Sequence, residues 1–313
     1  MKARNQQIDG ARGVLIVLVV WGHLLESKGF DGRLYFAIYT FHMPALVLIS
    51  GLVAKSHLDL KDLAGLVQRI VMPLIVFQAL YYYTLDYFAP DRALFGTAPA
   101  WIMWFLLSLL VWRLLLPLVV RIPHALFLSI VAALVAGTVD WIGYEYGLSR
   151  TFFFFPAFLF GHFYGARSIF LVTQYRAAFG FLFLALFFGA FGSATYFDIY
   201  WLWGFSSYSE LGAGVEGAVY RFSAILLGIV MSISLFALIP VYSRLLAQLG
   251  QRTMPIYLLH GFLVVLFWSV EVDGINKFEH TLLTAVLAII IAYLLAQLNA
   301  LSGTAQIFRT RER

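Results

Sequence analysis

The chain alternates between long apolar runs and short connections that hold most of its glycine, proline and charge. A helix needs about 20 apolar residues to cross the hydrocarbon core of a bilayer. The pattern predicts ten membrane-spanning helices: Gly13–Leu25 (extended at both ends), Leu34–Ala54, Leu66–Phe88, Trp101–Val120, Ala125–Gly143, Phe152–Ile169, Phe179–Phe197, Val219–Ile239, Pro255–Val270 and Leu282–Leu301. The one longer connection, residues 198–218, mixes tryptophan with glutamate, which is typical of an interfacial or re-entrant segment.

The overall composition agrees with this pattern. Of the 313 residues, 62% are hydrophobic and 12% are charged, whereas an ordinary globular domain has about 25% charged residues. We therefore expect an all-α membrane protein, a polytopic bundle in which residues 1–313 form a single membrane domain without a separate soluble domain. The sequence contains no cysteine, which excludes disulfides, thiolate chemistry and cysteine metal sites.

The distribution of charge predicts how the chain is oriented. Lysine and arginine gather in cytoplasmic connections of membrane proteins. If the N-terminus is cytoplasmic, 14 of the 21 basic residues lie on that side, six lie on the other, and Arg113 falls within a span. The alternation predicts that both termini are cytoplasmic in a cell (inner) membrane. The net charge of +5 then reflects topology, and we expect a lipid bilayer rather than nucleic acid as the partner of the chain.

Four histidines lie within predicted spans: His23, His42, His260 and His162. The glycines next to His162 predict that it packs between helices, so the candidates for function are the other three. Ionisable groups in a membrane are costly and usually face the interior of the bundle, where they serve function. Imidazole is also the side chain best suited to proton transfer near neutral pH. We expect no metal site at these histidines, on the premise that no acid or second histidine follows one helical turn later.

Arg12 and His23 share one face of the first span. They are eleven residues apart, which places the two side chains within about 20° of each other around a helix and about 16 Å apart along its axis. This geometry suits a long ligand with an anionic head at the arginine and a reactive tip at the histidine. The same pair is also compatible with a positive-inside anchor and a histidine that hydrogen-bonds between helices.

Several short motifs resemble the acyltransferase 3 family of membrane acyltransferases. The opening Asp9-Gly10-Ala11-Arg12-Gly13 is followed by Trp21-Gly22-His23, and the second span holds Phe41-His42-Met43-Pro44 and Ser50-Gly51. The further matches, in the order of the family, are Arg69 with Pro73, Trp104-Phe105-Leu106, Arg150 with Phe155-Pro156, Gly161, Gly250 and Pro255-Ile256-Tyr257-Leu258-Leu259-His260. They cover most of the chain. The arginine pair of the family's second loop is represented by Arg69 alone.

The resemblance implies an O-acyltransferase that moves an acetyl or other acyl group from cytoplasmic acyl-CoA to a hydroxyl of a sugar or cell-envelope polysaccharide. The pattern is most similar to the stand-alone branch that includes fucose O-acetylases. The donor is then acetyl-CoA or another acyl-CoA, the acceptor is a glycan, and no metal is needed.

Roles for individual residues follow from that resemblance. His23 is expected to act as the general base on the acceptor hydroxyl or as a transient acyl carrier. Arg12 and Arg69 are expected to bind phosphates of the donor. His42 and His260 are expected to orient His23, polarise the thioester or bind the acceptor. The remaining expected acceptor contacts are Arg150, Trp104 and Glu210.

A transporter or flippase of an envelope precursor is the alternative function. Ten spans, short loops and intramembrane histidines fit it equally well. The order of the motifs and the shared face of Arg12 and His23 favour the acyltransferase. The acceptor, the length of the acyl chain and the oligomeric state are not determined by the sequence.

Overall fold

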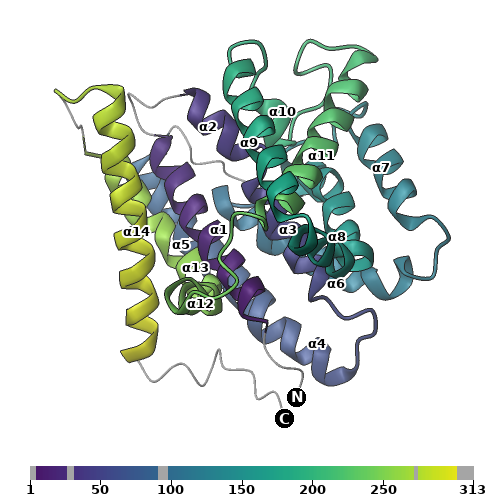
Figure 1. The fold of residues 1–313 in the computed structure, drawn as a ribbon, viewed down its shortest axis with the longest axis horizontal. Coiled ribbons are helices and arrows are strands. Elements are labelled where there is room, and N and C mark those ends of the chain that lie inside the picture. The colour runs from purple at the N-terminus through teal and green to yellow at the C-terminus, as the bar shows by residue number, and fades with distance from the viewer. Residues whose placement is uncertain (1–4, 27–31, 91–97, 271–273, 302–313) are drawn as a thin grey trace.

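The computed structural model describes residues 5–26, 32–90, 98–270 and 274–301, and this part of the chain contains helices and no strand (Figure 1). The helices are α1 (Gln6–Leu25), α2 (Gly32–Tyr39), α3 (His42–Leu52), α4 (Leu60–Leu66), α5 (Met72–Phe88), α6 (Trp104–Val119), α7 (Ala125–Ala136), α8 (Leu148–Gln174), α9 (Arg176–Ser193), α10 (Tyr200–Trp203), α11 (Glu216–Leu235), α12 (Arg244–Gln251), α13 (Thr253–Trp268) and α14 (Lys277–Leu301). Short 3-10 turns precede α6 (Trp101–Met103) and α8 (Glu145–Gly147).

The prediction of a polytopic helical bundle is confirmed. Within the described residues, eight helical segments are long and apolar enough to cross a membrane, and two further predicted spans correspond to the shorter apolar helices α7 and α13. The 12 residues of α7 extend only about 18 Å. The helix ends at Ala136 rather than at Gly143 because the Gly137 carbonyl accepts a hydrogen bond from the Tyr208 amide at 2.8 Å. A loop partner thus replaces the next helical turn.

The predicted second span is broken into α2 and α3. Thr40 and Phe41 separate the two helices. Pro44 has no amide hydrogen, so the Thr40 carbonyl four residues earlier loses its helical partner, and the proline ring crowds the same carbonyl. His42 consequently occupies the first position of α3, directly after the break.

The predicted third span is continuous but contains a π-helical turn. Val67–Val71 join α4 to α5 as a π-helix that carries Arg69. Pro73 follows four residues after Arg69 and cannot supply the amide that an α-helix would pair with the Arg69 carbonyl. The proline therefore accounts for the local widening, which alters the direction of the Arg69 side chain relative to a regular helix.

Two helix pairs approach so closely that only glycine fits between them. A Cβ atom added to Gly13 would lie 2.1 Å from the Leu246 carbonyl oxygen, and one at Gly250 would lie 1.7 Å from the Asp9 oxygen, so α1 and α12 touch backbone to backbone. The same holds for α3 and α8 at Gly51 and Gly161.

His162 belongs to the α3–α8 contact. Its Nδ1 donates a 3.3 Å hydrogen bond to the carbonyl of Gly51. Sequence analysis did not include His162 among the expected site residues, and its position between two helices gives it a packing role.

The connection between α9 and α11 folds back onto the bundle. Ser149 donates to the Gly204 carbonyl at 2.8 Å, and the Arg150 Nε donates to the Trp203 carbonyl at 3.2 Å. Arg221, which is buried, reaches the same Gly204 carbonyl at 3.0 Å. Gly204 has φ of +67° and faces the Phe153 ring, a conformation that favours glycine. Side chains from α8 and α11 thus hold this segment against the membrane helices.

The glycine contacts yield a test of packing. Gly161→Ala would place a methyl group 1.9 Å from the Leu48 carbonyl oxygen, and we expect it to lower the free energy of unfolding by about 1–3 kcal/mol through overpacking. The matched control is Gly189→Ala in α9, where an added Cβ meets nothing within 4 Å. Thermal unfolding of both variants in one detergent measures the difference. Equal Tm values for the two variants would contradict the close α3–α8 contact.

Candidate active site

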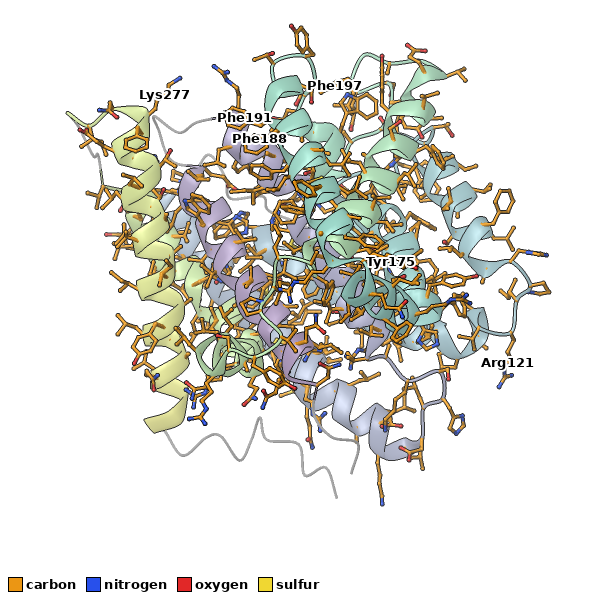
Figure 2. The ribbon with its side chains drawn as sticks, in the orientation of Figure 1. Arg121, Tyr175, Phe188, Phe191, Phe197 and Lys277 are labelled. Atoms are coloured by element: carbon orange, nitrogen blue, oxygen red, sulfur yellow. The ribbon has the colours of Figure 1, made fainter. Side chains whose placement is uncertain are left out.

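A cavity of about 910 Å³ lies inside the bundle, between the ends of α1, α2 and α3 and the segments around Trp101 and Trp203. Four residues expected to form the site from the sequence line it: His23, His42, Trp104 and Arg150. Lys277 and Phe197 also line it, and both lie at the upper end of the molecule in Figure 2. The cavity therefore faces the end of the bundle opposite to the start of α1.

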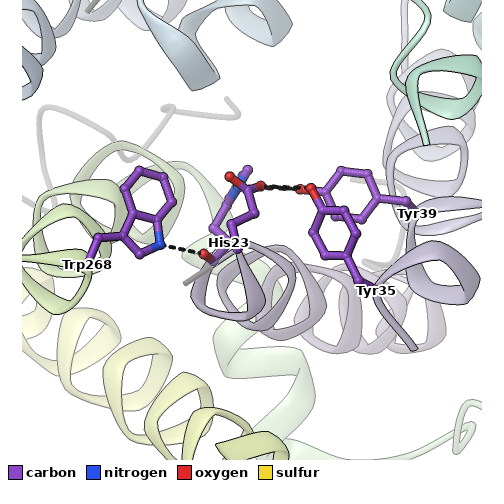
Figure 3. A network of polar contacts seen from close by, with 5 residues as sticks. His23, Tyr35, Tyr39 and Trp268 are labelled. Carbon is purple, nitrogen blue, oxygen red and sulfur yellow. Dashed lines mark hydrogen bonds and ion pairs between the residues drawn. The ribbon is translucent and has the colours of Figure 1, made fainter. Parts of the chain in front are cut away.

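His23 forms the centre of a hydrogen-bond network on the cavity wall. Its Nδ1 lies 2.9 Å from Oε1 of Glu26. The same carboxylate oxygen accepts hydrogen bonds from the hydroxyls of Tyr39 at 2.7 Å and Tyr35 at 3.1 Å. Figure 3 shows the two tyrosines on one side of His23 and Trp268 on the other. Three donors thus converge on one oxygen at the end of α1, and the geometry holds the imidazole in place.

The contact with Glu26 defines the tautomer of His23. An ionised carboxylate only accepts hydrogen bonds, so the Nδ1 atom of His23 carries the proton. In the neutral ring Nε2 then keeps its lone pair and can accept a proton. This is the arrangement in which a carboxylate orients a histidine base.

Sequence analysis missed Glu26. The residue follows His23 by three positions, a spacing that places both side chains on one helix face. The premise that no acid lies one turn after the predicted histidines is therefore wrong for His23. Within the described residues, however, no group of three or more histidine, cysteine and acidic side chains is arranged to hold a metal ion.

Aromatic and imidazole rings pack around His23. The His260 ring stacks on it with centroids 5.6 Å apart, and the Trp101 ring meets it edge-on at 4.7 Å. The Trp268 indole donates to the His23 carbonyl at 3.0 Å. His260 itself is fully buried and is not part of the cavity lining. Its Nδ1 donates to the Ile256 carbonyl at 3.0 Å, so this residue lies behind the base rather than facing the cavity.

His42 faces the cavity from the break between α2 and α3. Its Nδ1 lies 2.9 Å from the Ile38 carbonyl oxygen. A carbonyl only accepts, so Nδ1 is the donor and Nε2 is the nitrogen left for a ligand. The Tyr39 ring contacts His42 at a centroid distance of 4.4 Å and also hydrogen-bonds Glu26. One tyrosine thus connects the two cavity histidines.

Arg150 and Trp104 form a second part of the cavity wall. The guanidinium carbon of Arg150 lies 5.0 Å from the Trp104 ring centroid, 5.3 Å from that of Tyr144 and 4.9 Å from that of Phe205. Such contacts favour a cation over aromatic faces. The Phe154 ring stacks on Trp104 at 5.1 Å and holds it in place.

Glu210 lies in a smaller neighbouring cavity of about 370 Å³. The two cavities share Tyr144, Tyr200 and Phe205 in their walls. Glu210 also accepts a 3.0 Å hydrogen bond from the Ser207 amide, and this contact stabilises its own turn. The structure thus separates Glu210 from His23 by a wall of aromatic rings.

The arginines expected to bind the donor lie outside the cavity, towards the start of α1. Arg12 and Arg69 are absent from the cavity lining, but the charges of both act on Arg113 of α6. Arg113 was placed in a span without a role by sequence analysis, and its Nε is buried without a hydrogen-bond partner in the described structure. The charges of Arg12 and Arg69 thus reach Arg113 from two other helical segments, a feature that hydropathy alone does not reveal.

The arrangement combines a proton acceptor with two places for charged ligands. His23 and Glu26 can remove a proton from a group that enters the cavity. The three arginines can bind a polyanion at the other end of α1. Arg150 supplies a cation inside the cavity itself.

Comparison with known protein families agrees with this chemistry. A family model described as an acyltransferase domain matches residues 5–297, nearly the whole chain. No curated protein and no solved structure gives a significant match. The chain belongs to the acyltransferase 3 family and is a membrane acyltransferase.

Proposed function

We propose that this protein transfers an acetyl or other acyl group from cytoplasmic acyl-CoA to a sugar hydroxyl of a cell-envelope glycan. The observation that carries the proposal is the His23–Glu26 pair, with Nδ1 and Oε1 2.9 Å apart, on the wall of a cavity large enough for a sugar. Such a reaction brings two substrates to this base. The arginines Arg12, Arg69 and Arg113 offer a site for the donor near the start of α1, and the cavity at the other end of α1 offers a site for the acceptor.

The reaction at His23 follows from its tautomer. Nε2 takes the proton of the acceptor hydroxyl as the oxygen attacks the thioester carbonyl carbon, and a tetrahedral oxyanion forms. The imidazolium donates through Nδ1 to Glu26, which stabilises the new positive charge. When the carbon–sulfur bond breaks, the thiolate takes the proton from Nε2. The products are the O-acyl ester and free CoA, and His23 returns to its starting state.

The donor is proposed to extend along α1. Its phosphates bind Arg12, Arg69 and Arg113, and its thioester reaches His23, eleven residues beyond Arg12 and so about 16 Å farther along the axis. In the described structure Val19 of α1 lines the cavity, whereas the three proposed donor-binding arginines do not. Entry of the donor arm therefore requires side chains between α1 and α6 to repack.

The orientation of the chain makes this a reaction across a membrane. With both termini cytoplasmic, as the alternation of basic residues predicts, the arginines face the compartment that makes acyl-CoA. The cavity faces the opposite side, where envelope glycans are found. Residues 1–313 then form one membrane domain in a cell (inner) membrane, and the core cluster that joins α1, α3, α6, α8, α11 and α13 supports a single unit.

Removal of the base provides the first test of the proposal. We expect His23→Ala, inserted in membranes, to transfer acyl groups from radiolabelled acetyl-CoA at least about 10²-fold more slowly, because the substitution removes the imidazole that takes the proton of the acceptor hydroxyl. Donor binding is expected to persist. Full transfer by a correctly inserted His23→Ala variant would refute the mechanism, and a trapped radiolabelled His23 would show that the imidazole carries the acyl group itself.

Glu26 is a positioning residue, and its replacement should affect turnover more than binding. Glu26→Gln removes the negative charge opposite Nδ1, and we expect kcat to fall by about 10²-fold or more while the KM of the donor stays within about twofold. Glu26→Asp should recover part of kcat. The control is Glu145→Gln, at an exposed acid outside the cavity. An unchanged kcat for Glu26→Gln would exclude the positioning role.

Arg113 should contribute to donor affinity although it lies within a span. We expect Arg113→Leu to weaken acyl-CoA binding by about 10- to 100-fold, the effect of one lost hydrogen bond to a charged group. The control is Arg121→Leu, an exposed arginine just after α6 that Figure 2 places at the edge of the molecule. Equal donor KM values for the two variants would show that Arg113 is outside the donor site.

A further inference from the structure

Arg150 is a cation inside the cavity, and no carboxylate among the described residues forms an ion pair with it. Its Nε donates to the Trp203 carbonyl, and three aromatic rings surround its guanidinium group. Among the described residues, the Tyr144 hydroxyl is the side-chain hydrogen-bonding group next to the guanidinium. An arginine has five donors in a planar fork, so most of this capacity remains for a ligand.

The other charged side chains of the cavity lining are mostly cationic. Among the described lining residues the charged side chains are Arg33, Arg150, Lys277 and Glu26. The single acid, Glu26, already accepts hydrogen bonds from His23, Tyr35 and Tyr39. The cavity therefore has an excess of positive charge. A charge held away from bulk water is costly without a counter-charge, and the ligand is the component that can supply one.

The surroundings of Arg150 also suit a sugar ring. Trp104, Tyr144 and Phe205 present aromatic faces beside the guanidinium. Tyr144 and Phe205 continue, with Tyr200, into the wall of the smaller cavity. Rings that link two cavities in this way give consecutive sugar units surfaces to pack against.

We propose that the acceptor is an acidic glycan, and that Arg150 binds the carboxylate or phosphate of the sugar whose hydroxyl is acylated, or of its neighbour. His23, Glu26 and Arg150 line the same cavity, so the base and the cation can act on one bound ligand. A planar guanidinium binds a carboxylate or phosphate through two parallel hydrogen bonds, which positions the neighbouring hydroxyl for His23. The inference rests on the proposed acyl transfer, because it names the class of its acceptor.

Direct binding tests this inference without the acyl-transfer reaction. The purified protein in lipid nanodiscs is titrated with a β-1,4-linked tetramer of glucuronic acid and with cellotetraose, which differ only at C6. Calorimetry is expected to show at least about tenfold tighter binding of the acidic tetramer at low salt, with a preference that decreases as salt rises. Glucose 6-phosphate and monomeric glucuronic acid are then compared as competitors of the acidic tetramer. The stronger competitor identifies whether the site prefers a phosphate or a carboxylate.

Variants of Arg150 locate the effect. Arg150→Met should abolish the preference for the acidic tetramer while leaving the weaker binding of cellotetraose within about twofold, and Arg150→Lys should retain part of the preference. The matched control is Arg167→Met, an exposed arginine on the same helix. Equal binding of the two tetramers by the unaltered protein would overturn the proposal, as would failure to bind the acidic one. If Arg150→Met weakened the binding of the acidic tetramer and of cellotetraose equally, the proposal would also be overturned, because that result assigns Arg150 a structural role.

The acyl-transfer assay separates this proposal from the proposed function. Transfer to a neutral glycan with no preference for the acidic one would refute the acidic acceptor and leave the acyltransferase reaction intact. Selective binding of the acidic tetramer without transfer from any acyl-CoA would refute the proposed donor and reaction instead. Both results together, selective binding and preferential acylation, are the expected outcome.

Discussion

The hydrocarbon around this bundle contains no water, and this constrains where charged groups can lie in the interior of the protein. Lipid offers a buried charge neither a hydrogen bond nor a counter-ion. Each interior charge must therefore find a partner within the protein or face a cavity. Glu26 is held by His23, Tyr35 and Tyr39, and Arg221 by Ser149 and the Gly204 carbonyl. Arg150 has aromatic neighbours and faces the cavity. The candidate site lies in the cavity where Glu26 and Arg150 both satisfy this constraint.

The position of the base depends on contacts far from it. Gly13 and Gly250 allow α1 to lie directly against α12, and this contact fixes the helix that carries Arg12 at one end and His23 at the other. His260 and Trp101 then hold the imidazole from two directions. The proposed role of His23 as a base depends on such support, because small displacements of a catalytic group are costly in rate.

The two ends of α1 lie in chemically different surroundings. The arginine cluster gathers positive charge where a phosphate-rich donor is expected, and the cavity gathers aromatic rings and Arg150 where a glycan is expected. Packed side chains separate the two in the described structure. Under the proposed function, with the two substrates on opposite sides of the membrane, this separation keeps water away from the thioester, which an open passage would let it hydrolyse.

The sequence by itself determined the class of the protein and much of its chemistry. Hydropathy predicted a polytopic helical bundle, because a long apolar helix satisfies all its backbone hydrogen bonds within lipid. The spacing of Arg12 and His23 gave a shared helix face, which follows from helical periodicity alone. Glu26 was within reach of the same argument, three residues after His23, and was overlooked because it lies beyond the apolar run.

Only the tertiary structure decided which distant residues meet. His260 stacks on His23 although 237 positions separate them in the chain, and Arg113 joins Arg12 and Arg69 from a helix that hydropathy marks as an ordinary span. Glu210 was expected at the site but lies behind an aromatic wall. Each of these outcomes depends on how helices cross and where prolines interrupt them. Side chains at such crossings are set by long-range packing, which local periodicity does not encode.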